Sequence, residues 1–299
     1  MKYRFYTCDV FTDTRFGGNQ LAVLPTAEGL TDGQMQQIAR EFNFAETSFV
    51  FPPAAGHTRK VRIFTPACEV PFAGHPNIGT AAMLAAHGEL GDIGPAHVVM
   101  FEEKAGLVPI TIERRPGGRF RCELEAPERL SLGATVPIAA VAAAASLTEA
   151  DIVTATHQPR AGSVGLRFLL AEVRDRAALQ RARPNVAGLD RLASEEFGQP
   201  YLHLYTRDGD GFDLRTRQFS SSDPLLEDPA TGSANAALAG LLAHYDGSAS
   251  AEFRWRIAQG VEMGRPSLLE ARAVKQDGLV TNVWIAGEVV GVTEGVLDV

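Results

Sequence analysis

Two segments that each begin with a glycine carry the residues best suited to chemistry. Residues 74–85 read GHPNIGTAAMLA, and residues 232–243 read GSANAALAGLLA. His75 directly follows the first glycine, Ser233 directly follows the second, and Asp228 comes shortly before the second segment. Imidazole, hydroxyl and carboxyl groups in such positions can move protons on a small molecule.

The glycines themselves, Gly74 and Gly232, are each expected to lead into a helix. The first turn of a helix offers unpaired N–H groups and the positive end of the helix dipole, and a glycine lets a ligand come close to them. Alone, a glycine at such a place usually serves only a tight turn. A purely structural repeat, however, gives no reason for His, Asp and Ser beside it. Two such helix starts could together hold a small carboxylate or enolate, which favours an active site between two similar halves.

Glu46 is a further candidate, at the entry to a predicted strand in the same half as His75. Taken alone, a glutamate is usually a solvated surface residue. The flanking sequence FAETSFV is largely apolar and permits partial burial. Partial burial suits a carboxyl group to proton transfer near neutral pH.

Spacing excludes several other kinds of site. The seven histidines include no HExxH pair and the three cysteines no CxxC pair, so no metal is expected. The chain has no GxxxxGK[ST] loop and no GxGxxG after a strand, and Ser233 stands in TGSAN rather than in a GxSxG elbow. Of the kinds of site considered, acid–base chemistry without a cofactor remains.

The elements that must position these residues are short strands and a few helices. A helix is predicted at 31–42, one long strand over 98–113, and a helix start at Thr148. Strands are also predicted at 3–11, 21–24, 47–51, 60–64, 120–124, 167–173, 201–205, 211–219 and in the tail from 268 to 299. Each half also contains one strongly apolar helix, led by Gly74 or Gly232. The pattern therefore predicts an α+β fold of two similar halves.

Length and composition set further limits. A chain of 299 residues favours two domains, and the Pro-, Glu- and Gly-rich segment 126–135 places the boundary, giving domains at 1–126 and 127–282. A net charge of −8 argues against nucleic acid and anionic membrane surfaces as partners. An odd number of cysteines, no signal-peptide pattern and no apolar run of membrane-spanning length favour a cytoplasmic protein.

Ordered motifs along the chain resemble the phenazine-biosynthesis PhzF-like family. They are FGGNQLAV at 16–23, ETSFV at 46–50, RIFTP and EVPFAGHP between 62 and 76, DPATGSA at 228–234 and QGVEMGRPS at 259–267. The resemblance implies a diaminopimelate-epimerase-like fold, in which each domain is a curled, mostly antiparallel sheet around a central helix. It also implies a homodimer and a C-terminal strand, residues 283–299, that returns to the N-terminal domain.

The activity implied by this resemblance is isomerisation of trans-2,3-dihydro-3-hydroxyanthranilate, a small carboxylic acid, without a cofactor. Glu46 matches the acid and base that moves a proton between ring carbons. The residues matching those that surround and polarise the substrate are His75, Asp228 and Ser233, and the backbone positions near its carboxylate are Gly74 and Gly232. The phenazine enzymes carry a serine before the catalytic glutamate, where this chain has Ala45.

Two other functions stay open at this stage. Epimerases of the same fold use two cysteines, each just before a glycine-containing helix start, where this chain has Ala73 and the segment 229–231. A racemase or epimerase of a small amino or hydroxy acid would therefore act through Glu46 and a second base. A non-catalytic binding or scaffold protein would need none of these polar residues.

Overall fold

The computed structural model describes residues 1–192, 201–207, 209–221 and 226–299, and its chain divides into two units. The first unit is residues 1–125 with 286–299, and the second is residues 126–285. The last strand, β18 (Leu279–Asp298), begins in the second unit and ends in the first.

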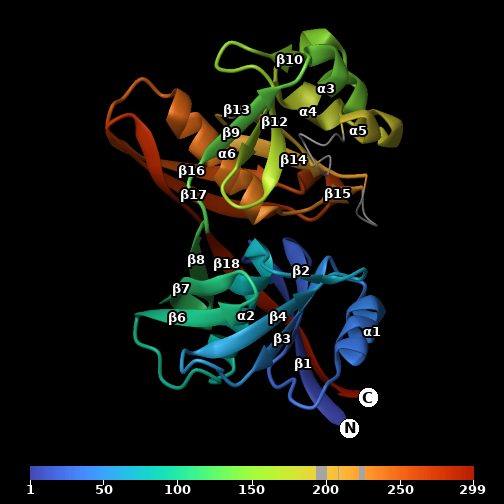
Figure 1. Ribbon diagram of the computed structural model, residues 1–299, viewed down its shortest axis with the longest axis vertical. Helices are drawn as coiled ribbons and strands as arrows, with labels where there is room; N and C mark the ends of the chain where they lie inside the picture. Colours follow the sequence, from blue (N-terminus) through green and yellow to red (C-terminus); the bar gives the residue numbers. More distant parts are fainter. Residues whose placement is uncertain (193–200, 208, 222–225) are drawn as a thin grey trace. The chain divides into compact units, whose positions relative to one another are not determined.

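The first unit combines short strands with two helices. Its elements are β1 (Lys2–Val10), β2 (Asn19–Leu24), α1 (Asp32–Phe42), β3 (Glu46–Phe51), β4 (Arg59–Phe64), β5 (Glu69–Val70), α2 (Gly74–Ala86), β6 (Ala96–Glu103), β7 (Gly106–Arg114) and β8 (Phe120–Glu125). β18 closes the sheet against β1 and β8, so that the two ends of the chain lie side by side (Figure 1).

The second unit has the same kinds of element with more helix. They are β9 (Ser131–Thr135), α3 (Ile138–Ala144), β10 (Ile152–Val153), β11 (Arg160–Ser163), β12 (Arg167–Val173), α4 (Arg176–Arg181), α5 (Val186–Leu192), β13 (Leu202–Arg207), β14 (Leu214–Phe219), β15 (Glu227–Asp228), α6 (Gly232–Tyr245), β16 (Ala251–Gln259) and β17 (Ser267–Gln276).

Strand pairing follows one plan in both units. In the first, β1–β2 is antiparallel, β2–β3 parallel, β3–β4 and β4–β5 antiparallel, and β4–β6 parallel. In the second, β11–β12, β12–β13, β13–β14, β14–β15 and β14–β16 pair in the same order and directions. The repeat seen in the two glycine-led segments is therefore part of a repeat of whole sheets.

One apolar helix lies against the sheet of each unit. Residues 75–85 of α2 and 234–243 of α6 are all buried, because these Ala- and Leu-rich segments are apolar on every side. α2 contacts β1, β2, β3, β7 and β8, whereas α6 contacts β11, β12, β16 and β17 (Figure 1). Gly79 lets α2 approach its sheet closely, since a Cβ there would stand 2.5 Å from Leu21 Cδ2 and 2.7 Å from Val10 Cγ2.

Local predictions met different outcomes. The predicted helix at 31–42 is confirmed as α1, and Thr31 and Gln34 form a reciprocal capping box at its start. The single strand over 98–113 is wrong, because a turn at residues 104–105 divides it into β6 and β7. The helix predicted at Thr148 is also wrong, since its capping box leads only into a 3-10 turn before β10.

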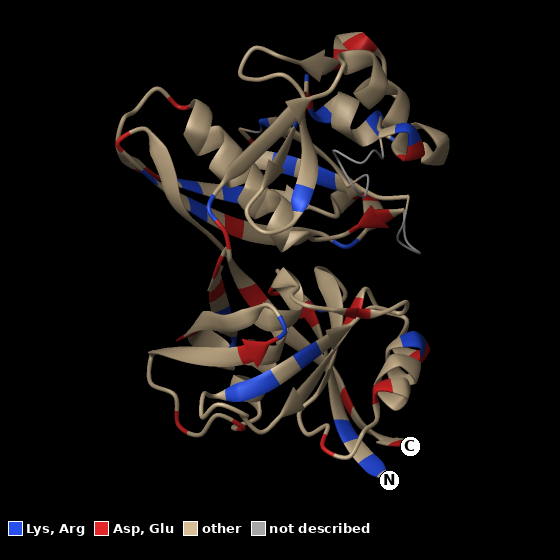
Figure 2. Cartoon of the chain, in the orientation of Figure 1, with Lys and Arg blue, Asp and Glu red and all other residues tan. Residues whose placement is uncertain are grey.

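No helix in the described ranges is long and apolar enough to cross a membrane. In the view of Figure 2, acidic and basic residues are interspersed over both units.

Candidate active site

Glu46 and His75 lie together in the first unit. Glu46 is the first residue of β3 and His75 the second residue of α2, and Glu46 Oε2 lies 3.3 Å from His75 Nε2. The alternation of β3 sends Glu46 toward α2, whereas Phe49 points into the apolar cluster under α1. The two side chains are 19% and 8% exposed, so the pair is sheltered from solvent.

The imidazole of this pair is neutral at ordinary pH. Burial lowers the pKa of His75 to about 3, and a hydrogen bond with the backbone of Gln20 acts in the opposite direction. A neutral imidazole beside a carboxyl group can relay or orient a proton without adding a fixed charge.

The starts of both central helices lack side-chain caps. The residues before them, Ala73 and Thr231, give α2 and α6 no side-chain cap, in contrast to the capping box of α1. The N–H groups in the first turn of a helix have no acceptor within the helix. Where no side chain caps them, they favour an anionic group.

Asp228 and Ser233 flank the corresponding helix start in the second unit. Asp228 ends β15 and its Oδ2 accepts a hydrogen bond from the Thr231 hydroxyl. Ser233 is the second residue of α6, the place that His75 has in α2, and it is partly exposed. Gln259 fixes the loop between them, because its Nε2 donates to the Asp228 carbonyl at 2.8 Å and its Oε1 accepts from Thr231 N at 3.1 Å.

An arginine–glutamate pair supports the same loop in each unit. Arg62 on β4 bonds both carboxylate oxygens of Glu69 on β5 at 2.8 Å, and Arg217 on β14 bonds both oxygens of Glu227 on β15 at 2.7 Å. β4 also carries Arg59 and Lys60, and this strand has blue segments in Figure 2. Such bidentate pairs have fixed geometry. They therefore hold β5 and β15, the short strands that lead directly to the two helix starts.

Comparisons with known proteins show the family to which this chain belongs. Residues 8–295 match the phenazine biosynthesis-like protein family. The chain belongs to this family. An uncharacterized isomerase of Mesorhizobium japonicum, mll1393, is 37% identical over 297 residues, covering 97% of this chain and 96% of that protein. The trans-2,3-dihydro-3-hydroxyanthranilate isomerase of Pseudomonas chlororaphis is 34% identical over 295 residues, covering 98% of both.

The fold prediction is confirmed by a solved structure. The Bacillus anthracis phenazine biosynthesis protein of the PhzF family superposes with a TM-score of 0.89 at 24% identity, covering 100% of both chains. The predicted enzyme class, an isomerase, is confirmed by these two relatives, both of which are named isomerases.

The structure places the six predicted site residues in two groups. Glu46, Gly74 and His75 lie together in the first unit, and Asp228, Gly232 and Ser233 lie around one helix start in the second. Their roles, and the expected active site between the halves, stay predictions. Within the described ranges, no cluster of three or more His, Cys, Asp or Glu side chains could hold a metal ion.

Three supporting residues were missed by sequence reasoning. Thr231 and Gln259 belong to the motifs DPATGSA and QGVEMGRPS, but only the fold shows that both contact Asp228. Glu103 carried no signal at all, because a glutamate among the charged residues of FEEK is usually exposed, yet its carboxyl oxygens are buried.

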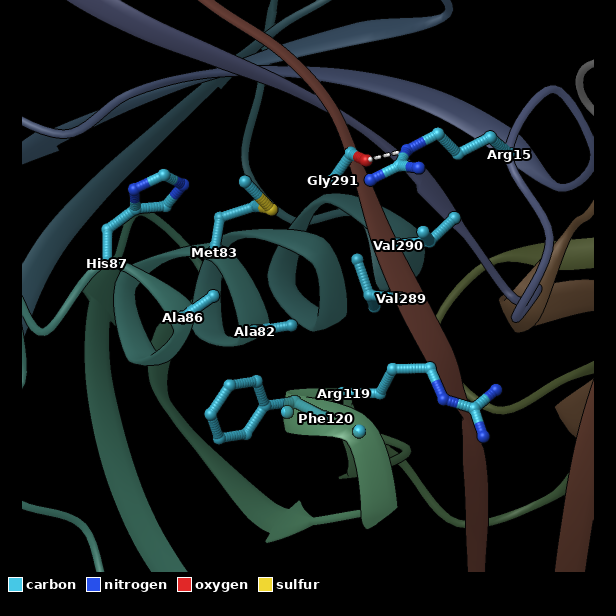
Figure 3. Close-up of a pocket in the computed structure, with 12 residues that line it drawn as sticks. Arg15, Ala82, Met83, Ala86, His87, Arg119, Phe120, Val289, Val290 and Gly291 are labelled. Carbon is cyan, nitrogen blue, oxygen red and sulfur yellow. Dashed lines mark hydrogen bonds between the residues drawn. The ribbon is translucent and has the colours of Figure 1, made fainter.

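A separate pocket of about 210 Å³ opens at the other end of α2 (Figure 3). It is lined by Ala82, Met83, Ala86 and His87 of this helix and its end, with Arg15, Gly117, Gly118, Arg119, Phe120, Val289, Val290 and Gly291. Arg15 donates to the Gly291 carbonyl, and Arg119 pairs with Asp13 and Glu288. None of the predicted site residues lines this pocket.

Proposed function

We propose that this protein is an isomerase that moves a proton between two carbons of a small carboxylic acid without a cofactor. Trans-2,3-dihydro-3-hydroxyanthranilate is the proposed substrate, supported by the relative from Pseudomonas chlororaphis that is named for this reaction. The observation that carries the proposal is the sheltered contact between Glu46 and a neutral His75 at the start of α2.

Glu46 supplies the chemistry in this proposal. Its carboxylate removes a proton from one carbon, the electron pair left behind shifts along the conjugated substrate, and the same carboxylic acid returns the proton to another carbon. Nothing is oxidised or reduced, and the carboxyl group ends as it began. The neutral His75 beside it orients the carboxyl group and polarises the substrate.

Negative charge on the substrate would be met by the uncapped helix starts. Backbone N–H groups near Gly74 and Gly232 are suited to a carboxylate and to the enolate character that develops during proton transfer. Asp228 and Ser233 are proposed to orient the polar groups of the substrate, with Asp228 held by Thr231 and Gln259.

The two-cysteine mechanism of epimerases with this fold finds less support. The residues immediately before the two helix starts are Ala73 and Thr231, not cysteines. Of the three cysteines, Cys8 and Cys122 are buried and Cys68 is exposed. A scaffold without turnover gives no reason for a buried Glu46–His75 pair, because burying such polar groups costs free energy.

Proton exchange in deuterium oxide tests the proposal. We would follow trans-2,3-dihydro-3-hydroxyanthranilate and a panel of small cyclic and amino acids by NMR, with the native protein, Glu46→Gln, and the matched control Glu41→Gln on the exposed side of α1. We expect isomerisation or deuterium uptake that falls about 10²–10⁴-fold in Glu46→Gln and is unchanged in the control. Equal exchange in all three proteins would refute the role of Glu46.

We further propose that the protein is a homodimer in the cytoplasm. Free cysteines and the family resemblance support this assignment. Sedimentation equilibrium of the full chain should give twice the monomer mass of 32.1 kDa, and a monomer mass would contradict the dimer.

A further inference from the structure

Glu103 and Gln259 occupy equivalent places in the two units. Each is the last residue of the strand that pairs in parallel with the arginine-bearing strand, β6 with β4 and β16 with β14. The registers agree, since Lys60 lies opposite Glu102 and Arg215 lies opposite Ala258. The internal repeat therefore matches a glutamate in the first unit to a glutamine in the second.

Both positions adjoin an asparagine in the first turn of the central helix. Asn77 Nδ2 donates to the Ala73 carbonyl and Asn235 Nδ2 donates to the Thr231 carbonyl, each at 3.0 Å. In the second unit Gln259 Oε1 accepts a second hydrogen bond from Asn235 Nδ2, at 2.7 Å. That glutamine thus connects the strand end to the helix start.

In the first unit the corresponding contact has a different chemistry. The corresponding side chain is Asn77, which lies near enough to Glu103 to lower the pKa of its carboxyl group. Both carboxyl oxygens of Glu103 and Oδ1 of Asn77 are buried. Burial of these oxygens disfavours an ionised carboxylate, so the site suits a protonated acid, whose carbonyl oxygen can still accept from an amide N–H.

We propose that Glu103 is a positioning residue of the first-unit site, which orients the first turn of α2 through Asn77 as Gln259 does for α6 through Asn235. The inference rests on the proposed function, since the residue so positioned is His75, which lies two residues before Asn77 in α2. A protonated carboxyl group resembles the glutamine amide, with one donor and one acceptor side, and ionisation removes the donor.

The protonation state agrees with this role. Burial raises the pKa of Glu103 to about 8, and the contact with Asn77 acts in the opposite direction. The titratable groups on the adjoining elements and on either side along the chain are Arg59, Lys60 and Arg62 on β4, Glu69 on β5, His75 on α2, Glu113 and Arg114 on β7, and Glu102 and Lys104. Desolvation is the largest cause of the shift, so the acid is neutral at pH 7 and ionises in mildly alkaline solution.

Histidine NMR tests the inference without any substrate. We would label the full chain with [¹³Cε1]-histidine, assign His75 with a His75→Gln variant, and titrate from pH 6.5 to 9.5. The pKa of His75 lies far below this range. We expect its signal to move with a midpoint near pH 8 in the native protein and to stay constant in Glu103→Gln, which keeps both donor and acceptor.

The reciprocal variant Gln259→Glu provides the matched control. It should leave the His75 signal as in the native protein and give a new alkaline transition to the signal of His203, which lies 3.2 Å from Asn235 Oδ1. A His75 signal that is flat in the native protein, or that still moves in Glu103→Gln, would overturn the inference. Because neither readout needs turnover, its failure is distinguishable from failure of the proposed reaction.

Discussion

The two arginine–glutamate pairs offer a test in which each unit is the control for the other. Arg217 is 3% exposed, and it donates to the carbonyls of Leu179 and Ala182 at 2.9 and 2.7 Å as well as to Glu227. Glu227→Gln leaves this buried guanidinium without a counter-charge. Removing one partner of a buried ion pair costs about 3–5 kcal/mol, and because glutamine keeps one acceptor we expect about 3 kcal/mol.

The equivalent substitution in the first unit should cost less. Arg62 is 19% exposed and also bonds Asp32 at 2.7 Å, so Glu69→Gln leaves a partner and some access to water. Hydrogen bonds to charged groups and partly exposed ion pairs suggest about 1–2 kcal/mol. Replacing this glutamate by glutamine should therefore lower the free energy of unfolding at least about 1.5 times as much in the second unit as in the first.

Urea unfolding can measure this difference unit by unit. Both tryptophans, Trp255 and Trp284, lie in the second unit, so their fluorescence reports on that unit while circular dichroism reports on both. We expect Glu227→Gln to shift the fluorescence transition strongly and Glu69→Gln to shift mainly a transition seen by circular dichroism. Equal losses, or a larger loss for Glu69→Gln, would refute the argument from burial.

Two further predictions concern packing and thiol chemistry. Gly79→Ala should destabilise the protein by about 1–3 kcal/mol, because the added Cβ would overlap the sheet under α2. Gly33→Ala, where a Cβ would meet no atom within 4 Å, should stabilise α1 by about 0.5–1 kcal/mol. The two thermal midpoints should shift in opposite directions, and an undiminished midpoint for Gly79→Ala would contradict the argument. An Ellman titration of the native protein should find one fast thiol, Cys68, because Cys8 and Cys122 are buried and burial raises the pKa of both. Fast reaction of all three thiols would contradict the packing around them.

The sequence predicted the parts of this molecule that depend on local chemistry. The repeated glycine-led segments predicted two similar halves, and their strongly apolar sequences predicted one buried helix in each half. Thr31 predicted the start of α1 through its capping geometry. The turn after Glu103 was missed because its two residues, Lys104 and Ala105, are not typical turn formers.

Long-range contacts decided what the sequence could not predict. Thr148 carries a proper capping signal, but the β-branched Ile152 continues into β10 and the helix does not extend. The burial of Glu103 follows from the parallel pairing of β6 with β4, between residues about forty positions apart. Composition alone assigns such a glutamate to the surface.

The path of β18 has a consequence for the order in which this protein is made. Lys2 to Val10 of β1 pair with residues 289–298 of β18, so the sheet that contains β1 is completed only by a strand that follows the second unit. The second unit, residues 126–285, is continuous and can close on itself earlier. During synthesis from the N-terminus, the first unit therefore stays incomplete until β18 has left the ribosome, and β1 has one unpaired edge until then.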